Sequence, residues 1–362
     1  MTSVAVRIDG QDYADYIDAS VTCSLENFAR TFQVSYSDKW IQAYRDQFPF
    51  VEGAACEIVV DGEVVIDGFV DEINIDYSNN SHSLQVSGRS WNGHMVDASA
   101  VHKSGAWKNA DLQTIANDIA APFGVEVIIH PEADADVALA FTEKFRRWAI
   151  EDEETAYACI ERAAKMRGLF LYSDAGRNII VSRAGVSRTT SALVYGQNVI
   201  RANANRRYSE RHSYYLVKSQ TAGDETWYAD DASSKLFAKE TDDAITTYRP
   251  LIVVSDGQGT KPELELRAKW ERNVRAGRAR RFTYEVNGWQ RTEGGLWQPN
   301  ERIPVDDPIF DLSGEMLIAA VQFHQRFPGG STTTLELAPP ESFDILVPPK
   351  KKLKKRKGGV DW

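Results

Sequence analysis

The sequence contains only three cysteines in 362 residues. Cys23, Cys56 and Cys159 lie far apart and have neither a CxxC nor a zinc-ligand spacing, so we expect reduced, buried thiols. No apolar run approaches the ~18 residues that mark a membrane span. The first residues, MTSVAVRIDGQDY, lack the apolar core of a signal peptide, so we expect no secretory signal. These absences predict a protein that is made in a reducing cytoplasm.

Positive charge is scarce outside one segment. The chain has 42 basic and 52 acidic residues, and seven of the eight residues from Lys350 to Lys357 are basic. Residues 1–349 therefore hold 35 basic and 51 acidic residues, a net charge of −16. Phosphate backbones repel such an acidic body, which disfavours a fold that reads DNA. The tail has no interleaved aromatic residues for base stacking, so we expect a solubilising or docking arm, with DNA contact as the alternative.

Several short patterns resemble catalytic or binding motifs but lack the required spacing. GRSWNG at 88–93 misses the nucleophile elbow, and GQGTK at 257–261 lacks phosphate-loop spacing. Asp134 and Asp136 lack the glycine and glutamate of a calcium loop and are expected to be solvated loop carboxylates. The six histidines show no HxH or HExxH pattern. The remaining carboxylate candidates lie at expected hairpin turns, where aspartate is common: Asp61, Asp67, Asp306, Asp307 and Asp311. We therefore expect no enzyme, no metal and no cofactor.

Residues 1–98 are predicted to be all-β. Ile58 and Val60 alternate with other positions before a tight Asp61-Gly62 turn, and further alternating strands follow up to the turn at 78–81. Several short strands at close spacing favour a small β-barrel or sandwich.

Residues 99–188 predict a small α/β module. Asn109 is expected to cap a helix whose apolar residues, Leu112, Ile115, Ala116 and Ile119, recur at helical spacing. A second helix is expected to open at 152–154, where three acids suit the positive end of the helix dipole, and to end at Gly168. A hairpin turning at 174–176 completes the module.

The chain after residue 188 is predicted to return to β structure. Residues 189–225 and 282–345 form a second β-barrel in this interpretation, and 226–281 form an inserted peripheral domain with a helix at 262–277. Residues 346–362 are the basic flexible tail. Ile58-x-Val60-Asp61 and Ile303-x-Val305-Asp306 each precede a long hairpin, which favours two related β-domains. The predicted fold class is therefore a β-rich α+β multidomain protein.

Two groups of arginines are candidate contact residues. The first surrounds the end of the last helix and comprises Arg272, Arg275, Arg278, Arg280 and Arg281. The second comprises Arg201, Arg206, Arg207 and Arg211. Each group is either a solvated face that pairs with acids of this chain, or a subunit contact or lining of a nucleic-acid passage. The tail residues Lys350, Lys351, Lys352, Lys354, Lys355, Arg356 and Lys357 are candidate polyanion or partner contacts on the same grounds.

The order of weak motifs along the chain resembles the baseplate hub proteins of Mu-like contractile-tailed phages. These motifs are Arg249-Pro250, Trp270-Glu271, Arg275-Ala276-Gly277, Gly288-Trp289, Trp297-x-Pro299-Asn300, Leu317-Ile318 and Pro340-Glu341-x-Phe343. The hairpin with Val60-Asp61-Gly62 and Gly68-Phe69-Val70-Asp71 is similar to the first hub hairpin, and 152–183 is similar to part of the wider T4-type hub and late-control group.

This resemblance implies a T4-type baseplate hub architecture in the virion tail. It implies a homotrimer whose six β-barrels form a pseudo-sixfold ring between the sixfold tail tube and the threefold central spike. The implied partners are other copies of the chain, the spike, tube or tube-initiator proteins, baseplate wedge and tape-measure proteins, and DNA in non-specific passage during ejection. Assembly in the cytoplasm of the bacterial host follows from the same resemblance.

Three other functions remain open from the sequence. The chain could be the hub part of a type VI secretion spike, although it shows neither the oligonucleotide-binding-like domain nor the repetitive β-helix of that class. A tail-associated cell-wall hydrolase would need a positioned acid pair or metal site. A DNA-binding protein would retain duplex DNA without its tail and at ~200 mM salt.

Overall fold

The computed structural model describes residues 4–14, 16–36, 50–78, 82–219, 236–254 and 261–343. The chain divides into two compact units. The first contains residues 1–211 and 273–345, and the second contains 212–272 together with 346–362. The basic tail and GQGTK at 257–261, except Lys261, lie outside the described residues, as does most of the turn expected at 78–81.

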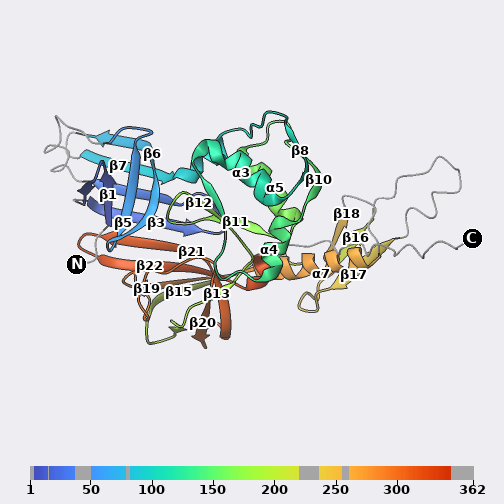
Figure 1. The fold of residues 1–362 in the computed structure, drawn as a ribbon. Helices are drawn as coiled ribbons and strands as arrows, with labels where there is room; N and C mark the ends of the chain where they lie inside the picture. Colours follow the sequence, from blue (N-terminus) through green and yellow to red (C-terminus); the bar gives the residue numbers. More distant parts are fainter. Residues whose placement is uncertain are drawn as a thin grey trace, which may run out of the picture. The chain divides into compact units, whose positions relative to one another are not determined.

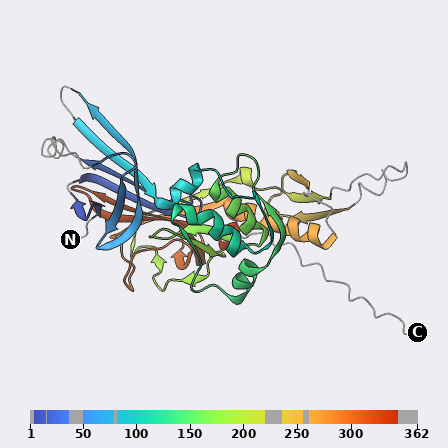
Figure 2. The ribbon, with the colours of Figure 1, turned by 45° about the horizontal axis from the view of Figure 1, so that its top comes forward.

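The first unit is built on a 14-stranded sheet with two halves. In the first half, the chain order β3, β4, β5, β6, β7 becomes the spatial order β3-β4-β7-β6-β5, with two N-terminal strands beyond β5. These strands are β1 (Val4–Ile8), β2 (Gln11–Tyr13), β3 (Tyr16–Ser24), β4 (Thr31–Tyr36), β5 (Ala55–Val60), β6 (Glu63–Tyr77) and β7 (His82–Ser90). Figure 2 shows β6 and β7 (light blue) projecting from the sheet as a ribbon.

The second half repeats this topology. The chain order β15, β19, β20, β21, β22 becomes β15-β19-β22-β21-β20, and two short parallel strands pair with β20. The strands are β13 (Ser187–Arg188), β14 (Leu193–Val194), β15 (Val199–Arg206), β19 (Arg280–Asn287), β20 (Glu301–Asp307), β21 (Leu312–Arg326) and β22 (Gly330–Ala338). The internal duplication predicted from the sequence is therefore visible in the strand order.

The two halves also share two bulges, although the further bulge of β5 against β6 has no counterpart between β20 and β21. β6 bulges at Asp71 where it pairs with β7, and β21 bulges at Ala319 where it pairs with β22. β3 bulges at Ile17 and β15 at Ile200, each against the next strand of its own half. A bulge changes the local twist and register, so matching bulges mark equivalent positions.

Aligning the halves on these bulges corrects the alignment suggested by the sequence. Cys56 lies opposite Gly68, two residues before Val70 and the bulge of β6. The equivalent residue of the second half, Ile303, lies opposite Met316. Ile303 thus corresponds to Cys56 and not to Ile58, because the turns joining each strand pair differ in length.

The halves form one continuous sheet through the pairing of β21 with β3. In Figure 1, β21 (orange-red) lies beside β3 (blue) at this junction. Among the described strands, neither half closes into a barrel by itself, so the expected pair of small barrels is not confirmed. The β-rich class is confirmed. The junction instead makes each half an arc of a larger sheet.

Residues 91–183 contain the helices and strands of a small α/β module, which we expected at 99–188. Its two layers contain a two-stranded and a three-stranded sheet with helices packed on them. The elements are α2 (His94–Asp97), β8 (Ala106–Ala110), α3 (Leu112–Ala120), β9 (Glu126–Ile129), α4 (Ala135–Thr142), β10 (Phe145–Ala149), α5 (Ala156–Met166), β11 (Phe170–Ser173) and β12 (Asn178–Ser182). The apolar positions predicted for the two main helices are buried in one core.

The helix starts of this module differ from the prediction. Asp111, not Asn109, caps α3, because its carboxylate accepts a hydrogen bond from the Thr114 backbone N–H. Thr155 caps α5, so the acids at 152–154 precede the helix. Asp134 is an exposed carboxylate in the loop before α4, as expected, and also caps that helix. In each case an Asp or Thr nearer to the first turn reaches the free N–H groups.

The second unit contains a separate three-stranded sheet. Its strands are β16 (Tyr214–Lys218), β17 (Phe237–Thr241) and β18 (Pro250–Val254), with β16 in the centre. Helix α7 (Lys261–Arg278) begins in this unit, and Leu264 and Ala268 pack on its sheet. Residues 212–219 belong to this unit, and β16 pairs with β17 and β18.

All three cysteines are free and buried, which confirms the predicted reduced thiols. None of the helices in the described ranges is long and apolar enough to cross a membrane.

Candidate assembly surface

One face of the 14-stranded sheet is polar across both halves. Alternation on β3 buries Ala19, Val21 and Cys23 on the core side and turns Ser20 and Thr22 to the other side. A row of directly opposed residues continues this polar side from β15 to β7: Arg201, Glu285, Thr334, Gln322, Thr22, Thr31 and Arg89. Hydroxyls and amides dominate this face, and its few charges are of both signs.

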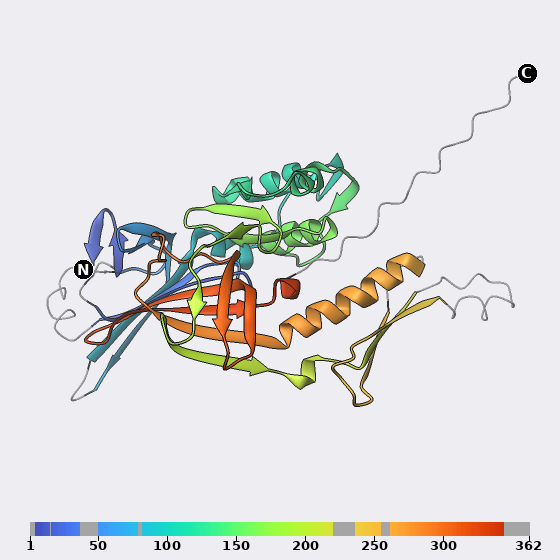
Figure 3. The same ribbon diagram turned by 90° about the horizontal axis from the view of Figure 1, so that it is seen from below.

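Besides the short strand β2, two longer stretches at the edge of the 14-stranded sheet pair on one side only among the described residues. The first part of β6 pairs with β5 as far as Phe69, whereas residues 71–76 pair with β7 alone. β15 pairs on one side only, with β19, and lies at the margin of the sheet in Figure 3 (yellow-green). Unpaired edges expose backbone donors and acceptors that another strand can satisfy.

These two edges carry opposite charge. Asp71, Glu72 and Asp76 lie on the β6 stretch and are exposed. Arg201, Arg206 and Arg207 lie on or directly after β15 and are exposed as well. The arginine group predicted from the sequence thus follows a sheet edge. The sequence analysis missed the acidic edge, whose signal was the alternation in DEINIDY.

Two of the arginines near the end of α7 pair with acids of this chain. Within the second unit, Arg272 pairs with Glu240. Within the first unit, Arg281 pairs with Glu26 and its guanidinium lies 5.5 Å from the centroid of the Phe343 ring. These two residues follow the alternative of pairing with acids of the same chain.

The remaining members of this group are placed as follows. Arg275 and Arg278 occupy the last turn of α7, where cations suit the helix dipole. Arg280 and Arg206 line a small cavity of about 170 Å³ with Phe282 and Phe310. Arg206 also donates a hydrogen bond to the Phe310 carbonyl.

Three of the five carboxylates considered as catalytic candidates have structural partners. Asp67 accepts hydrogen bonds from Arg177 at 2.8 and 3.1 Å and so ties β6 to the β11–β12 hairpin of the module. Asp61 accepts from Gln290 at 2.6 Å. Asp307 accepts from the Tyr284 hydroxyl at 3.0 Å and from the Ile309 backbone N–H at 2.9 Å, which fixes the turn after β20.

Two buried polar side chains attach the module to both half-sheets. Arg30 donates to the carbonyls of Val65 and Ser173, at 3.0 and 3.1 Å, and so links β6 to β11. Asn300 accepts from the Gly185 N–H at 2.8 Å and donates to the Arg183 carbonyl at 3.2 Å, which holds the end of the module to the start of β20. The motif Trp297-x-Pro299-Asn300 therefore has a structural role.

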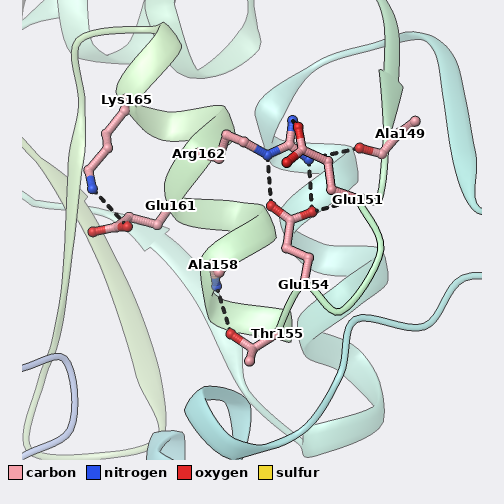
Figure 4. A network of polar contacts seen from close by, with 8 residues as sticks. All are labelled: Ala149, Glu151, Glu154, Thr155, Ala158, Glu161, Arg162 and Lys165. Atoms are coloured by element: carbon pink, nitrogen blue, oxygen red, sulfur yellow. Dashed lines mark hydrogen bonds and ion pairs between the residues drawn. The ribbon is translucent and has the colours of Figure 1, made fainter.

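The densest polar network of the module surrounds Arg162 (Figure 4). Arg162 donates to both carboxylate oxygens of Glu154, at 2.7 and 2.8 Å, and to the Ala149 carbonyl at 2.8 Å. Its guanidinium lies 4.0 Å from the centroid of the Trp148 ring. Burial alone would raise the pKa of Glu154, but the hydrogen bonds and charge of Arg162 bring it below its ordinary value. The network holds α5 to β10.

In the parts of the chain that the structure describes, no group of three or more His, Cys, Asp or Glu side chains is placed to hold a metal ion. The distinctive features of the surface are instead its polar face and its two complementary edges.

Three family models of phage baseplate proteins match consecutive parts of the chain. The N-terminal model of the Mu phage baseplate assembly protein GpP-like family matches residues 3–90. The second-domain model of the baseplate hub protein gp44-like family matches 92–183. The fourth-domain model of the Mu phage GpP family matches 260–346. Together they span the first half-sheet, the module and the strands β19 to β22 of the second half-sheet.

Known proteins agree with these matches over nearly the whole length. The baseplate hub protein gp44 of Escherichia phage Mu is 30% identical over 362 residues, which cover 99% of this chain and 92% of that protein. The 43 kDa tail protein of prophage MuSo2 from Shewanella oneidensis superimposes with a TM-score of 0.82 at 31% identity, covering 95% of this chain and 100% of that one.

A structure of lower sequence identity has a similar fold. An E. coli component of the type VI secretion system, described as structurally similar to the T4 tail proteins gp27 and gp5, matches with a TM-score of 0.54 at 12% identity and covers 95% of this chain and 79% of that one. The duplicated sheet, the intervening module and the match to Mu gp44 lead to one conclusion: this chain belongs to the baseplate hub family of Mu-like phages and is a structural protein of the phage tail.

Proposed function

We propose that three copies of the chain form a closed ring that serves as the baseplate hub between the tail tube and the central spike. The observation that carries this proposal is the duplicated half-sheet, with the same strand order and two matching bulges in each half. Two equivalent halves per chain give six similar arcs in a trimer. A threefold assembly can thereby present nearly sixfold symmetry to a tube and threefold symmetry to a spike.

The two faces of the sheet favour one orientation in such a ring. The core side carries additional layers, because the apolar side chains of both halves pack there with β1, β5 and β20. The polar side carries no such layer among the strands of the row from Arg201 to Arg89. When the sheet curves into a ring, the side with the additional layers fits on the outside, where the circumference is larger. The polar side therefore faces the centre in our proposal.

A polar lining with few charges suits the passage of DNA. A strongly basic wall would hold the phosphate backbone, and its release would depend steeply on salt. The polar row has hydroxyl and amide groups at Thr334, Gln322 and Thr22. In this proposal DNA is a transient, non-specific passenger, and the chain performs no catalysis.

The basic tail has a separate role in the proposal. It docks on an acidic neighbour in the baseplate or contacts DNA near the passage, without reading sequence. The spike, the tube or tube initiator, the wedge and the tape-measure protein are the proposed partners of the assembled ring.

Light scattering across a concentration series tests the oligomeric part of this proposal. The expected mass of the purified full-length chain is three times 40.6 kDa. A dimer of stable mass, or a monomer at all concentrations both alone and with the spike protein of the same phage, would overturn the proposed ring.

A further inference from the structure

We infer that the free edge of β6 in one copy pairs antiparallel with β15 of the next copy, in a register given by the junction between the two halves of a single chain. This inference rests on the proposed ring and identifies the strands that join its members. The partner is a second copy of the chain. The contact is a main-chain ladder, as in strand addition to an exposed sheet edge.

The topology of one chain predicts which edges meet. At the internal junction, the second part of β21 pairs with β3, the first strand of the other half. β6 is the counterpart of β21, and β15 is the counterpart of β3, by strand order and by their bulges. The second part of β21 pairs with β22 on one side and with β3 on the other. The second part of β6 pairs with β7 on one side, and its other side has no partner strand among the described residues. The equivalent junction between copies therefore joins β6 to β15.

The bulges set the register of this second junction. Gln322 lies opposite Thr22 at the internal junction. Gln322 lies three residues after the bulge at Ala319, and Asn74 lies three residues after the equivalent bulge at Asp71, so Asn74 is the counterpart of Gln322. In the same way, Thr22 and Asn205 each lie five residues after the equivalent bulges at Ile17 and Ile200, so Asn205 is the counterpart of Thr22. Asn74 of one copy is therefore placed opposite Asn205 of the next.

The same count assigns the neighbouring pairs. Glu72 lies opposite Arg207 and Asp76 opposite Asn203 on the polar face. Ile75 lies opposite Ala204 on the core side. Cross-strand neighbours of opposite charge stabilise an antiparallel pair, and so does an apolar pair on the core side. The opposite charges of the two edges thus fall into contact in this register.

Exposure supports a missing strand at this edge. Phe323 is 1% exposed at the internal junction, where Val21 lies opposite it. Its counterpart Ile75 is 58% exposed. An apolar side chain at a sheet edge, equivalent to a buried one, is explained if another copy covers it. Because β6 and β15 are different surfaces, the contact is head-to-tail and generates a ring when the rotation closes.

Cysteine cross-linking tests both the strands and the register. The variant Asn74→Cys with Asn205→Cys places two thiols opposite each other between copies, within the reach of a disulfide. The native cysteines are buried and give little background. The matched control, Asn74→Cys with Asn203→Cys, moves one thiol by two residues along the same face. Mild oxidation is followed by non-reducing electrophoresis, and the solution mass of each variant is measured before oxidation.

The expected result is a ladder that ends at a covalent trimer for the 74/205 variant, with at least fivefold less product for the 74/203 control. A trimeric variant that forms no cross-link, or cross-links better through 74/203, would overturn the strand register and leave the ring standing. A wild-type chain that is not trimeric even with its spike protein would overturn the proposed function, which the mass measurement shows independently.

Discussion

Arg326 donates a hydrogen bond to Asp18 at 2.8 Å across the junction of β21 and β3, where the two half-sheets of the chain meet. Tyr16 adds a second side-chain contact there, because its hydroxyl donates to Gln325 at 2.8 Å. Further along the same junction, Phe323 lies opposite Val21, and both side chains are buried. The junction therefore has an exposed polar end and an apolar interior.

The apolar interior is expected to carry most of the stability of this junction. Phe323→Ala should lower the free energy of unfolding by ~3–5 kcal/mol, because it removes a fully buried ring. Asp18→Ala should cost less than ~1 kcal/mol, because the ion pair with Arg326 is exposed to water. Urea unfolding of the two variants measures both values. An Asp18→Ala effect as large as that of Phe323→Ala would contradict this ranking.

Gly277 is expected to tolerate no side chain. It lies in α7 where the helix meets the turn at 340–343, and a Cβ there would come within 2.9 Å of the Ser342 backbone nitrogen. Gly277→Ala should therefore destabilise the protein by ~1–3 kcal/mol through overpacking, although alanine favours helices. Gly329→Ala, at a turn with ordinary contact distances, is the matched control. Thermal unfolding of both variants decides, and a Gly277→Ala variant as stable as wild type would refute the close contact.

The Glu154–Arg162 network predicts a loss of stability in acid. The folded-state pKa of Glu154 lies below its ordinary value of 4.5, so the carboxylate stabilises the folded chain above pH 4.5. That contribution is lost as the pH falls through the lower, folded-state pKa. The melting temperature of wild type should therefore fall towards that of Glu154→Gln between about pH 5 and pH 3. Glu151→Gln, on the exposed side of the same arginine, should follow wild type. Parallel curves for wild type and Glu154→Gln would contradict the assignment.

Charge reversal tests the proposed contact of the two edges by a different route from cross-linking. Glu72→Arg should weaken the trimer, because it places an arginine opposite Arg207 of the next copy. Adding Arg207→Glu should restore it. The expected effect is ~0.2–1 kcal/mol at each junction, larger at low salt. Dissociation on dilution, followed by mass, is the measurement, and Glu63→Arg on the paired part of β6 is the control. Failure of the second substitution to rescue the first would speak against the pair.

Removal of residues 350–362 separates the tail from the ring. The shortened chain should remain trimeric, because both proposed edges lie within residues 71–207. Retention of duplex DNA by the full chain should fall steeply between ~50 and ~200 mM salt and disappear with the tail. A gel-shift series at several salt concentrations measures it. Salt-resistant retention by the shortened chain would reveal a DNA-binding surface on the acidic body.

The sequence predicted the elements whose signals are local. Helical spacing of Leu112, Ile115 and Ile119 marked α3, and the hairpin at 174–176 followed from its turn residues. The duplication was detectable because both halves repeat strand, turn and strand. The helix caps were misplaced by one to three residues, since several polar residues near each start compete for the same N–H groups.

The assembly edges could not be predicted in the same way. Whether Glu72 or Arg201 lies at a free edge depends on which distant strand pairs with its neighbour, and that pairing has no local signal. Likewise, Asp67 and Arg177 meet only because β6 contacts the module. The arginines at 272 and 281 were grouped by sequence proximity, but each pairs with an acid that is distant in the chain.

Electron microscopy of the purified full-length chain tests the central claim most directly. The account predicts end-on class averages that show a closed ring with six similar lobes around a central opening, reduced to threefold symmetry by the module and the second unit. Rings with another number of lobes, or particles in which the duplicated half-sheets do not alternate around one opening, would contradict it.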